Sequence, residues 1–305
     1  MIDIQVNGYA EVNFNSAPID EHQLGLAADR LRADGVEAIL LTIVTDDLSR
    51  MAARLVSLRH LIDQDAGLQK LIPAFHIEGP FISMVEGYRG AHPVEHIRPA
   101  EVDDMNGLLD AAGGPHRVAL VTLAPEVDDR LAVTRLLVEQ GIHVAAGHTD
   151  APLDLLLEAE QAGLDLFTHL GNGSAALMDR HDNIINRALS LEKIRYSLIA
   201  DGHHLPWFAL QNYIHAAGIE RCLITTDCTA GAGAGPDFDP GGNREIDRSG
   251  ETPVLRLKGT PYLAGACATM KQNYDNLIRH VGLTESQARA MCVDNPLDFI
   301  GKWAG

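Results

Sequence analysis

Residues 71–80 read LIPAFHIEGP, an apolar run that ends in an acid, a glycine and a proline. The run predicts a buried strand, which Gly79 and Pro80 end. The carboxylate of Glu78 is costly to bury at such a strand end unless a cation lies nearby. Three later apolar runs also end in a metal-binding or acid–base side chain: VAAGH at 144–148, LFTH at 166–169 and LITTD at 223–227. The sequence therefore predicts a fold that brings four strand ends together.

Strand-like apolar runs alternate with helical patterns along the chain. The predicted strands are 2–6, 36–44, 71–78, 118–123, 142–148, 164–169, 195–200 and 221–227. They are continuously apolar, as expected for a sheet covered on both faces. Eight such βα units in 305 residues predict an α/β fold of the (β/α)8 TIM-barrel type, as one domain over 1–305. An open doubly wound sheet is the alternative, which the lack of G-x-G-x-x-G after the first strand disfavours.

Helical periodicity and capping signals fill the segments between these strands. The predicted helices are 20–33, 46–63, 100–111, 128–140, one after Asp150, a short one before 195, 206–217, 266–280 and 285–293. Residues 231–250 are rich in Gly, Pro and Asp, so we expect a mobile loop there. Residues 254–258 are expected to form one arm of a small hairpin.

The composition limits the possible partners and the compartment. Twenty-four basic and 42 acidic residues give a net charge of −18, which argues against nucleic acid and anionic membranes as partners. We see neither a membrane-length apolar run nor a signal peptide. The four cysteines form no C-x-x-C pair, so we expect reduced thiols in a cytoplasmic protein. Cys228, beside Asp227, is expected to be a small buried residue rather than a nucleophile.

In a barrel, the residues at the carboxyl ends of the strands surround one mouth. The residues expected there are Gln5, Asn7, Glu78, His148, His169, His204 and Asp227. One carboxylate and two imidazoles suit Zn2+ or another borderline divalent ion, and three protein ligands leave a position for water. A single strand-end histidine is more often a hydrogen-bonded rim residue, so the coincidence of four strand ends carries the prediction. His76 lies one layer deeper than Glu78 and is expected to support the ligands rather than bind the metal.

Nine short motifs resemble the N-acetylglucosamine-6-phosphate deacetylase family of the amidohydrolase superfamily. They are IDIQVNG at 2–8, HIEGPF at 76–81, GAH at 90–92, LAPE at 123–126, GHT at 147–149, THL at 168–170, DGHH at 201–204, TD at 226–227 and LAG at 263–265. The matches run in order over nearly the whole chain. Together they are specific, although each piece alone is not.

The resemblance implies a role for each site residue. The metal ligands would be Glu78, His148 and His169, the general acid–base Asp227, the group that polarises the acetyl carbonyl His92, and the substrate-binding residues Gln5, Asn7, His92, Asn172, Gly173, Arg180 and His204. Gln5-Val6-Asn7 stands where many amidohydrolases carry H-x-H, so we expect one divalent metal per chain. Zn2+ is the first choice, and Fe2+ or another divalent ion is the alternative. The metal would activate water for attack on the acetamide, which would release acetate and an amino sugar.

The sequence departs from the family in three places. The family's small β domain is expected to be absent, because the chain begins at the first strand and ends at Gly305. Gly171-Asn172-Gly173-Ser174 replaces the family's usual aromatic and Asn-Ala-Met after Thr-His-Leu. Arg180 matches the phosphate-binding arginine by spacing, but Asp179 and Asp182 flank it and would weaken its field. In the family this arginine reaches into a neighbouring subunit's site, so a homodimer is implied.

Three functions compete. The first is a metal-dependent hydrolase that converts N-acetylglucosamine 6-phosphate, a small-molecule substrate, to acetate and glucosamine 6-phosphate. The second is the same chemistry on an unphosphorylated or different N-acyl substrate. The third is a non-catalytic sugar-binding barrel, which the intact Asp227 disfavours, because a binding protein needs no proton shuttle.

Overall fold

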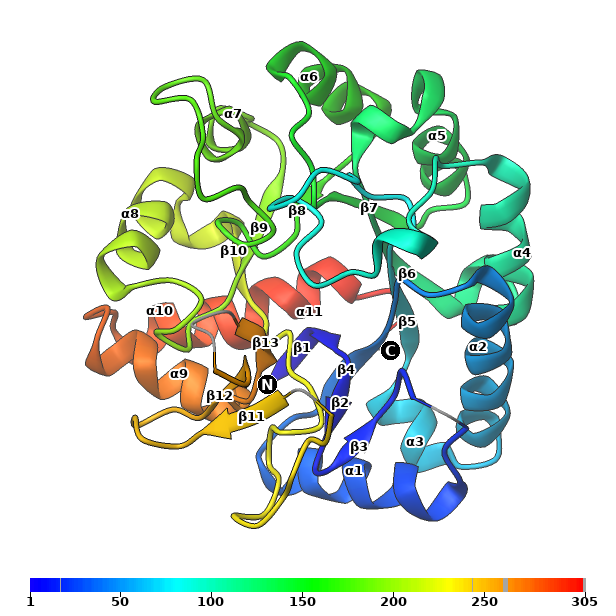
Figure 1. The fold of residues 1–305 in the computed structure, drawn as a ribbon, viewed down its shortest axis with the longest axis vertical. Helices are drawn as coiled ribbons and strands as arrows, with labels where there is room; N and C mark the ends of the chain where they lie inside the picture. Colours follow the sequence, from blue (N-terminus) through cyan, green and yellow to red (C-terminus); the bar gives the residue numbers. More distant parts are fainter. Residues whose placement is uncertain (17, 243, 260–262, 304–305) are drawn as a thin grey trace. The chain divides into compact units, whose positions relative to one another are not determined.

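The computed structural model describes residues 1–16, 18–242, 244–259 and 263–303. Eight strands form one sheet in the order β1-β4-β5-β6-β7-β8-β9-β10 (Figure 1). They are β1 (Ile2–Val6), β4 (Ala38–Val44), β5 (Ala74–Glu78), β6 (Val118–Leu123), β7 (His143–Ala146), β8 (Leu166–Phe167), β9 (Arg195–Leu198) and β10 (Cys222–Ile224). The fold is the predicted (β/α)8 barrel with parallel strands.

Helices follow the strands along the chain, as the sequence predicts. They are α1 (Glu21–Ala33), α2 (Leu48–Asp63), α3 (Ala66–Leu71), α4 (Val102–Ala112), α5 (Ala132–Glu139), α6 (Leu153–Ala162), α7 (Ile184–Leu189), α8 (Trp207–Ala217), α9 (Met270–Arg279), α10 (Glu285–Arg289) and α11 (Asn295–Ile300). A π-helical segment, Ala290–Asp294, joins α10 to α11. Capping boxes begin α1, at Asp20 and Gln23, and α9, at Thr269 and Gln272, and satisfy backbone N–H groups at each helix start.

The contacts divide the chain into two compact units. The first unit comprises residues 1–42, 60–73 and 198–305, and the second comprises 43–59 and 74–197. The prediction of a single domain over residues 1–305 stays a prediction.

The second unit holds the central run of the parallel sheet. β5 pairs with β6, β6 with β7 and β7 with β8, for example with Glu78 opposite Thr122 and Leu123 opposite Ala146. The strands are buried along almost their whole length, because α4, α5 and α6 lie outside them (Figure 1). This layering places Glu78 at the carboxyl end of β5 and leaves the loops after β7 and β8 to carry the two histidines.

The first unit holds the strand that begins the sheet and the strand that ends it. β1 pairs with β4, and Val6 forms a parallel bridge with Cys228 just after β10. The N–H of Asn7 donates to the Cys228 carbonyl over 2.9 Å. α11 packs against both β1 and β10. β1 and the end of β10 are therefore held side by side.

Two small sheets complete the first unit. β2 (Gly8–Tyr9) pairs with β3 (Val12–Asn13), and β11 (Arg244–Asp247), β12 (Val254–Leu257) and β13 (Leu263–Ala266) form an antiparallel sheet. The hairpin predicted at 254–258 is confirmed. The loop predicted over 231–250 is wrong in part, because residues 244–247 form β11 and pair with β12; Asn243 lies outside the described residues. Helix α3 was not predicted: residues 66–70 were assigned to neither helix nor strand, and Leu71 was taken for the start of the next strand.

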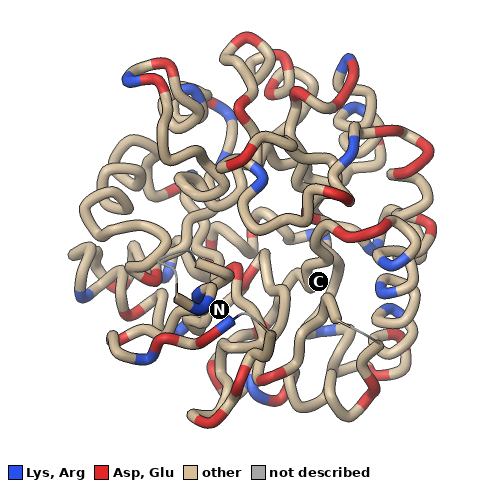
Figure 2. The backbone as a smooth tube through the Cα atoms, in the orientation of Figure 1, with Lys and Arg blue, Asp and Glu red and all other residues tan. Residues whose placement is uncertain are grey.

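Charge and cysteine environments follow the composition. In Figure 2 the acidic residues are spread along helices and loops of both units. All four cysteines are buried thiols, and burial raises the pKa of the Cys228 thiol well above its usual value. Cys228 is thus a small buried residue, as predicted. Along the described residues, none of the helices is long and apolar enough to cross a membrane.

Candidate metal and catalytic site

Three buried side chains of the second unit converge on one point. Glu78 Oε1 lies 3.3 Å from His148 Nε2 and 3.0 Å from His169 Nε2, and the two nitrogens are 3.1 Å apart. None of the three residues is more than 7% exposed. Burial by itself raises the pKa of Glu78, but the contacts with His148 and His169 outweigh it and hold that pKa well below its usual range. These are the three residues that the sequence assigns to a metal.

The donor set fits a metal ion. A tetrahedral ion with ligands at 2.0–2.2 Å separates neighbouring ligand atoms by roughly 3.3 Å. The observed separations of 3.0, 3.3 and 3.1 Å are close to this value. Because His148 Nδ1 donates to the Tyr88 carbonyl, Nε2 of the neutral ring carries a lone pair that faces Glu78 Oε1, and a cation between these two atoms would stabilise the arrangement. A divalent cation is the group that one oxygen and two imidazoles suit.

His148 is fixed on both sides of its ring. Its Nδ1 donates to the Tyr88 carbonyl over 2.9 Å, which leaves Nε2 to face Glu78. A Cβ at Gly173 would lie 2.7 Å from Nδ1, and one at Gly90 would lie 3.3 Å from Cε1. Both glycines have positive φ, +56° and +57°. The ring is therefore held by a backbone hydrogen bond and by two glycine loops, of which the one at Gly173 passes too close for a Cβ.

The backbone at the strand ends is unusual. Of the seven described non-glycine residues with positive φ, three are His148 (+52°), His169 (+32°) and Asp227 (+49°). Each of them follows a barrel strand. Such φ values are costly for residues with a Cβ and cluster at functional sites. They turn the side chain at a strand end while the strand itself stays buried.

A hydrogen-bonded layer lies beneath the ligands. His76 Nε2 lies 2.8 Å from Thr122 Oγ1, which lies 2.7 Å from Thr168 Oγ1. His76 is fully buried on β5, two residues before Glu78. The supporting role of His76 stays a prediction.

His92 lies on the loop after β5, beside Glu78, His148 and His169, which are called the metal group below. Its ring centroid is 4.3 Å from that of His148, and its Nδ1 is 2.7 Å from Thr45 Oγ1. Burial, followed by the neighbouring His148, lowers the pKa of His92 to about 3. The imidazole is therefore neutral near pH 7, and one of its nitrogens is engaged by Thr45.

The first unit brings together three other predicted residues. Asp227 Oδ1 accepts from Gln5 Nε2 over 3.1 Å and from Asn7 Nδ2 over 2.7 Å. Asp227 lies three residues after the end of β10, and the two amides come from the end of β1. His204 Nδ1 lies 2.7 Å from Asp201 Oδ2, and the Asp201 carboxylate also accepts the backbone N–H groups of His203 and His204. His204 is thus held by an acid that sequence reasoning did not single out.

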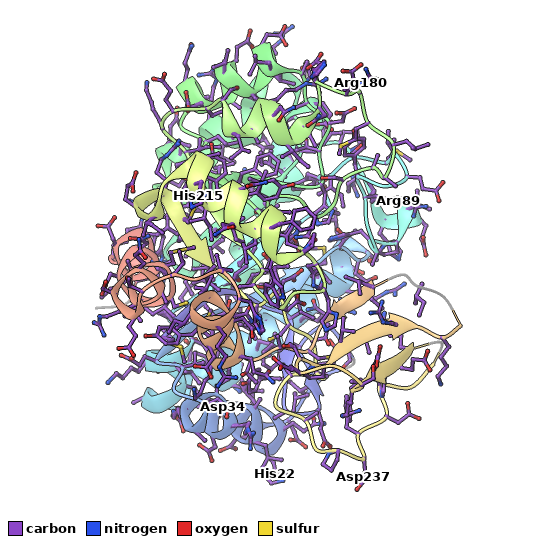
Figure 3. All side chains as sticks on the ribbon, turned by 90° about the vertical axis from the view of Figure 1, so that its left-hand side faces the viewer. His22, Asp34, Arg89, Arg180, His215 and Asp237 are labelled. Atoms are coloured by element: carbon purple, nitrogen blue, oxygen red, sulfur yellow. The ribbon has the colours of Figure 1, made fainter. Side chains whose placement is uncertain are left out.

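Arg180 and Asn172 lie on the loop after β8. Asn172 Nδ2 donates to the His169 carbonyl over 3.2 Å, so this loop is tied to a metal-group residue. Arg180 is exposed, and Figure 3 draws both Arg180 and Arg89 on outward loops of the second unit. Asp182 is engaged by Arg187 at 2.5 Å and Asp179 by backbone N–H groups. The charge of Asp182 is therefore compensated by a residue other than Arg180.

Known proteins resemble this chain over almost its full length. No family model matches it. It is 32% identical over 306 residues to N-acetylglucosamine-6-phosphate deacetylase of Bos taurus, covering 98% of this chain and 73% of the relative. It is 33% identical to N-acetylgalactosamine-6-phosphate deacetylase of a Shewanella species, with the same coverage.

The chain belongs to the N-acetylglucosamine-6-phosphate deacetylase family.

Solved structures of deacetylases in this family show the same fold. The enzyme of Pasteurella multocida matches with a TM-score of 0.84 at 27% identity, covering 98% of this chain and 76% of that one. An aspartate-to-alanine variant from Mycobacterium smegmatis, solved in complex with N-acetyl-D-glucosamine-6-phosphate, matches with a TM-score of 0.83 at 28% identity and the same coverage. The chain thus spans about three quarters of the length of its relatives.

Some residues of the deacetylase-family site escaped sequence reasoning. Thr45 directly follows β4, so the strand-end rule that found Glu78 could have found it. Asp3 carried a signal too, because an acid inside a buried strand needs partners. The Tyr88 carbonyl carried no sequence signal, because every residue type supplies the same backbone carbonyl group.

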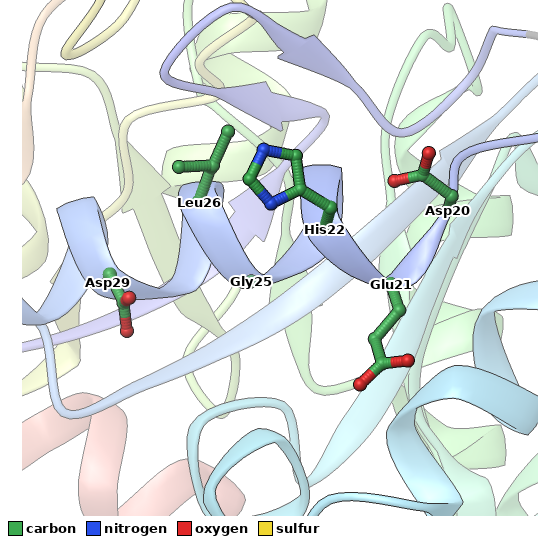
Figure 4. A pocket seen from close by; sticks show the side chains of 6 residues that line it. All are labelled: Asp20, Glu21, His22, Gly25, Leu26 and Asp29. Atoms are coloured by element: carbon green, nitrogen blue, oxygen red, sulfur yellow. The ribbon is translucent and has the colours of Figure 1, made fainter.

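A separate surface depression lies away from the predicted site residues. It lies along the exposed face of α1 and is lined by Asp20, Glu21, His22, Gly25, Leu26 and Asp29 (Figure 4). Its residues include none of the predicted site residues. An acidic helix face of this kind is ordinary solvated surface.

Proposed function

We propose that this protein hydrolyses the acetamide of N-acetylglucosamine 6-phosphate to acetate and glucosamine 6-phosphate. The observation that carries the proposal is the convergence of Glu78, His148 and His169 in a member of this deacetylase family. One divalent ion per chain, with Zn2+ as first choice, would be held by these three residues. It would supply an activated water and a polarised acetyl carbonyl.

The chain's own residues then have distinct tasks. Asp227 takes the proton of the attacking water and returns it to the leaving amine. His92 donates a hydrogen bond to the carbonyl oxygen as negative charge develops there. Thr45 Oγ1, 2.7 Å from His92 Nδ1, holds the ring in place for this role. His204, held by Asp201, binds the sugar.

The phosphate is assigned to the loop after β8. Arg180 and the backbone N–H groups around Asn172 and Gly173 are the proposed donors, with Arg89 as a further one. An arginine matches a phosphate through two parallel hydrogen bonds. The exposure of Arg180 within its own chain suits an arginine that serves a second subunit, so we propose a homodimer. Sedimentation of a fully active monomer would contradict this part alone.

The compartment follows from the thiols. All four cysteines are buried and unbridged, which suits a reducing environment. We therefore assign the protein to the cytoplasm. Cell fractionation followed by immunodetection checks this, and detection of the protein mainly in a non-cytoplasmic fraction would contradict the assignment.

The galactosamine epimer is the second candidate substrate. The observation that favours it is the 33% identity to the N-acetylgalactosamine-6-phosphate deacetylase of Shewanella, beside 32% to the N-acetylglucosamine-6-phosphate deacetylase of Bos taurus. An unphosphorylated N-acetyl sugar is a further alternative within the same chemistry. All of these share the metal group and Asp227 and differ at the sugar and phosphate contacts.

One experiment separates these candidates. Acetate release by the zinc-loaded protein is measured with N-acetylglucosamine 6-phosphate, N-acetylgalactosamine 6-phosphate and N-acetylglucosamine. The proposal predicts the highest kcat/KM for the first. A higher value for the second selects the epimer, equal values for the first and third remove the phosphate assignment, and no acetate from any of them removes the deacetylase assignment.

A further inference from the structure

Two neutral amide side chains from the end of β1 contact the carboxylate of Asp227. Gln5 and Asn7 lie at the end of β1, on the same side of the strand by its period of two. Both donate to a single atom, Asp227 Oδ1, at 3.1 and 2.7 Å. Gln5 is only 1% exposed, so its amide cannot be turned toward bulk water. Two donors from one strand therefore converge on one oxygen of the residue to which we assign proton transfer.

A second set of contacts, one layer deeper, joins β1 to the segment that follows β10. Asp3 is 2% exposed and accepts from Thr225 Oγ1 at 2.6 Å and from Thr226 Oγ1 at 2.5 Å. It also accepts the backbone N–H groups of Thr226 and Gln5. Thr225 and Thr226 are the two residues before Asp227. The buried carboxylate of Asp3 thus anchors the segment that ends in Asp227.

The backbone of Asp227 explains why such anchoring is needed. Its φ of +49° is in the left-handed region, which a residue with a Cβ enters at a cost of about 1–2 kcal/mol. That conformation persists only where surrounding contacts impose it. The hydrogen bonds to Asp3 hold the backbone before Asp227, and the two amides hold its carboxylate.

We propose that Gln5 and Asn7 are positioning residues for Asp227. Because both amides bind Oδ1, they set the plane of the carboxylate and the direction of Oδ2. Amide N–H groups carry no exchangeable charge at neutral pH, so they orient the carboxylate without competing for its proton. The sequence assigned these two residues to the substrate, whereas their nitrogen atoms are used within the protein. The inference rests on the proposed function, since it assumes that Asp227 moves a proton.

The test is a double-mutant cycle in the full-length, zinc-loaded protein. Gln5→Leu and Asn7→Leu are each made alone and in an Asp227→Asn background, and kcat, KM and bound zinc are measured. Alone, each replacement should lower kcat about 10- to 100-fold, as expected for losing a hydrogen bond to a charged group. KM and bound zinc should stay unchanged. In the Asp227→Asn background the same replacement should lower kcat no further, because the group that it positions is already lost.

Two further sets of variants control for unfolding and for effects that any glutamine or asparagine replacement would have. Asn7→Asp and Gln5→Glu keep the shape but present an acceptor to Oδ1, so they should lower kcat at least as much as the leucine variants. Gln69→Leu is the matched control, because Gln69 is exposed on α3 and its amide donates to the Asp63 carbonyl, at 2.9 Å. It should retain the kcat of the wild type.

Each contrary result has its own meaning. A raised KM with unchanged kcat would overturn the inference and restore the substrate-binding role. An equal loss of kcat in both backgrounds would show that the amides act independently of Asp227. If the wild type releases acetate from none of the three sugars, the proposed function fails and the inference fails with it, because no proton transfer is left to organise.

Discussion

At the scale of single residues, the proposed metal group of Glu78, His148 and His169 should bind an ion only when all three side chains are present. Removing one imidazole leaves Glu78 buried beside a single partner, which cannot hold a divalent ion tightly. We expect His148→Ala and His169→Ala each to reduce bound metal from one ion per chain to nearly none and to abolish activity. Elemental analysis after dialysis measures this. His22→Ala, on the exposed face of α1 (Figure 4), should change neither quantity, and a metal-replete His169→Ala protein would remove His169 from the ligand set.

Asp227 separates proton transfer from metal binding. Asp227→Asn keeps the shape of the side chain but removes the base. We expect turnover to fall by about 10²- to 10⁴-fold, the usual contribution of general acid–base catalysis. Bound metal should remain at the wild-type level. Near-normal turnover in this variant would mean that another residue moves the proton.

At the scale of elements, the loop after β8 shapes the metal group through one glycine. A Cβ at Gly173 would lie 2.7 Å from His148 Nδ1, the atom that donates to the Tyr88 carbonyl. Gly173→Ala should therefore displace the ring and weaken metal binding about 10- to 100-fold, in the range for lost supporting contacts. Isothermal titration with Zn2+ after chelation checks this.

Gly241→Ala is the control for backbone strain. Gly241 also has positive φ, +73°, but a Cβ there meets nothing within 4 Å. It should cost about 1–2 kcal/mol of stability and leave the zinc affinity unchanged. Equal zinc affinities for the two variants would show that contact with His148 does not matter.

The elements could be predicted because their signals are local. Apolar runs ending in Glu78 and Asp227 located β5 and β10, and the capping residue Asp20 located the start of α1. Helix α3 was missed because its six residues run directly into the next apolar stretch. β11 was missed because its pairing partner, not its own composition, makes it a strand.

For the site too, the sequence predicted some features and not others. The residue types at the strand ends predicted the Glu78, His148 and His169 group, because the carboxyl ends of parallel barrel strands surround one mouth. The amide contacts to Asp227 were assigned to the substrate instead, because a sequence does not show which way an amide nitrogen points. The Tyr88 carbonyl was invisible for the same reason: side-chain identity does not determine the contacts of a backbone group.

At the scale of the whole molecule, the net charge opposes the proposed substrate. A chain with a charge of −18 repels a phosphate at long range, so local donors must supply the attraction. If Arg180 is one of them, Arg180→Ala should lower kcat/KM for the 6-phosphate sugar roughly 10- to 100-fold, the equivalent of one charge-assisted hydrogen bond. N-Acetylglucosamine itself should be almost unaffected. A comparison of wild type and variant with both sugars checks this, and equal slowing of both would remove Arg180 from phosphate binding.

The central claim is that this chain is a metal-dependent deacetylase of N-acetylglucosamine 6-phosphate. The most direct measurement is acetate release from this sugar by the purified protein as isolated, after chelation, and after return of one equivalent of Zn2+. The account predicts one acetate and one free amine per substrate consumed, loss of activity on chelation and its recovery with zinc. Undiminished activity in the metal-free protein, or no acetate from the zinc-loaded protein, would contradict it.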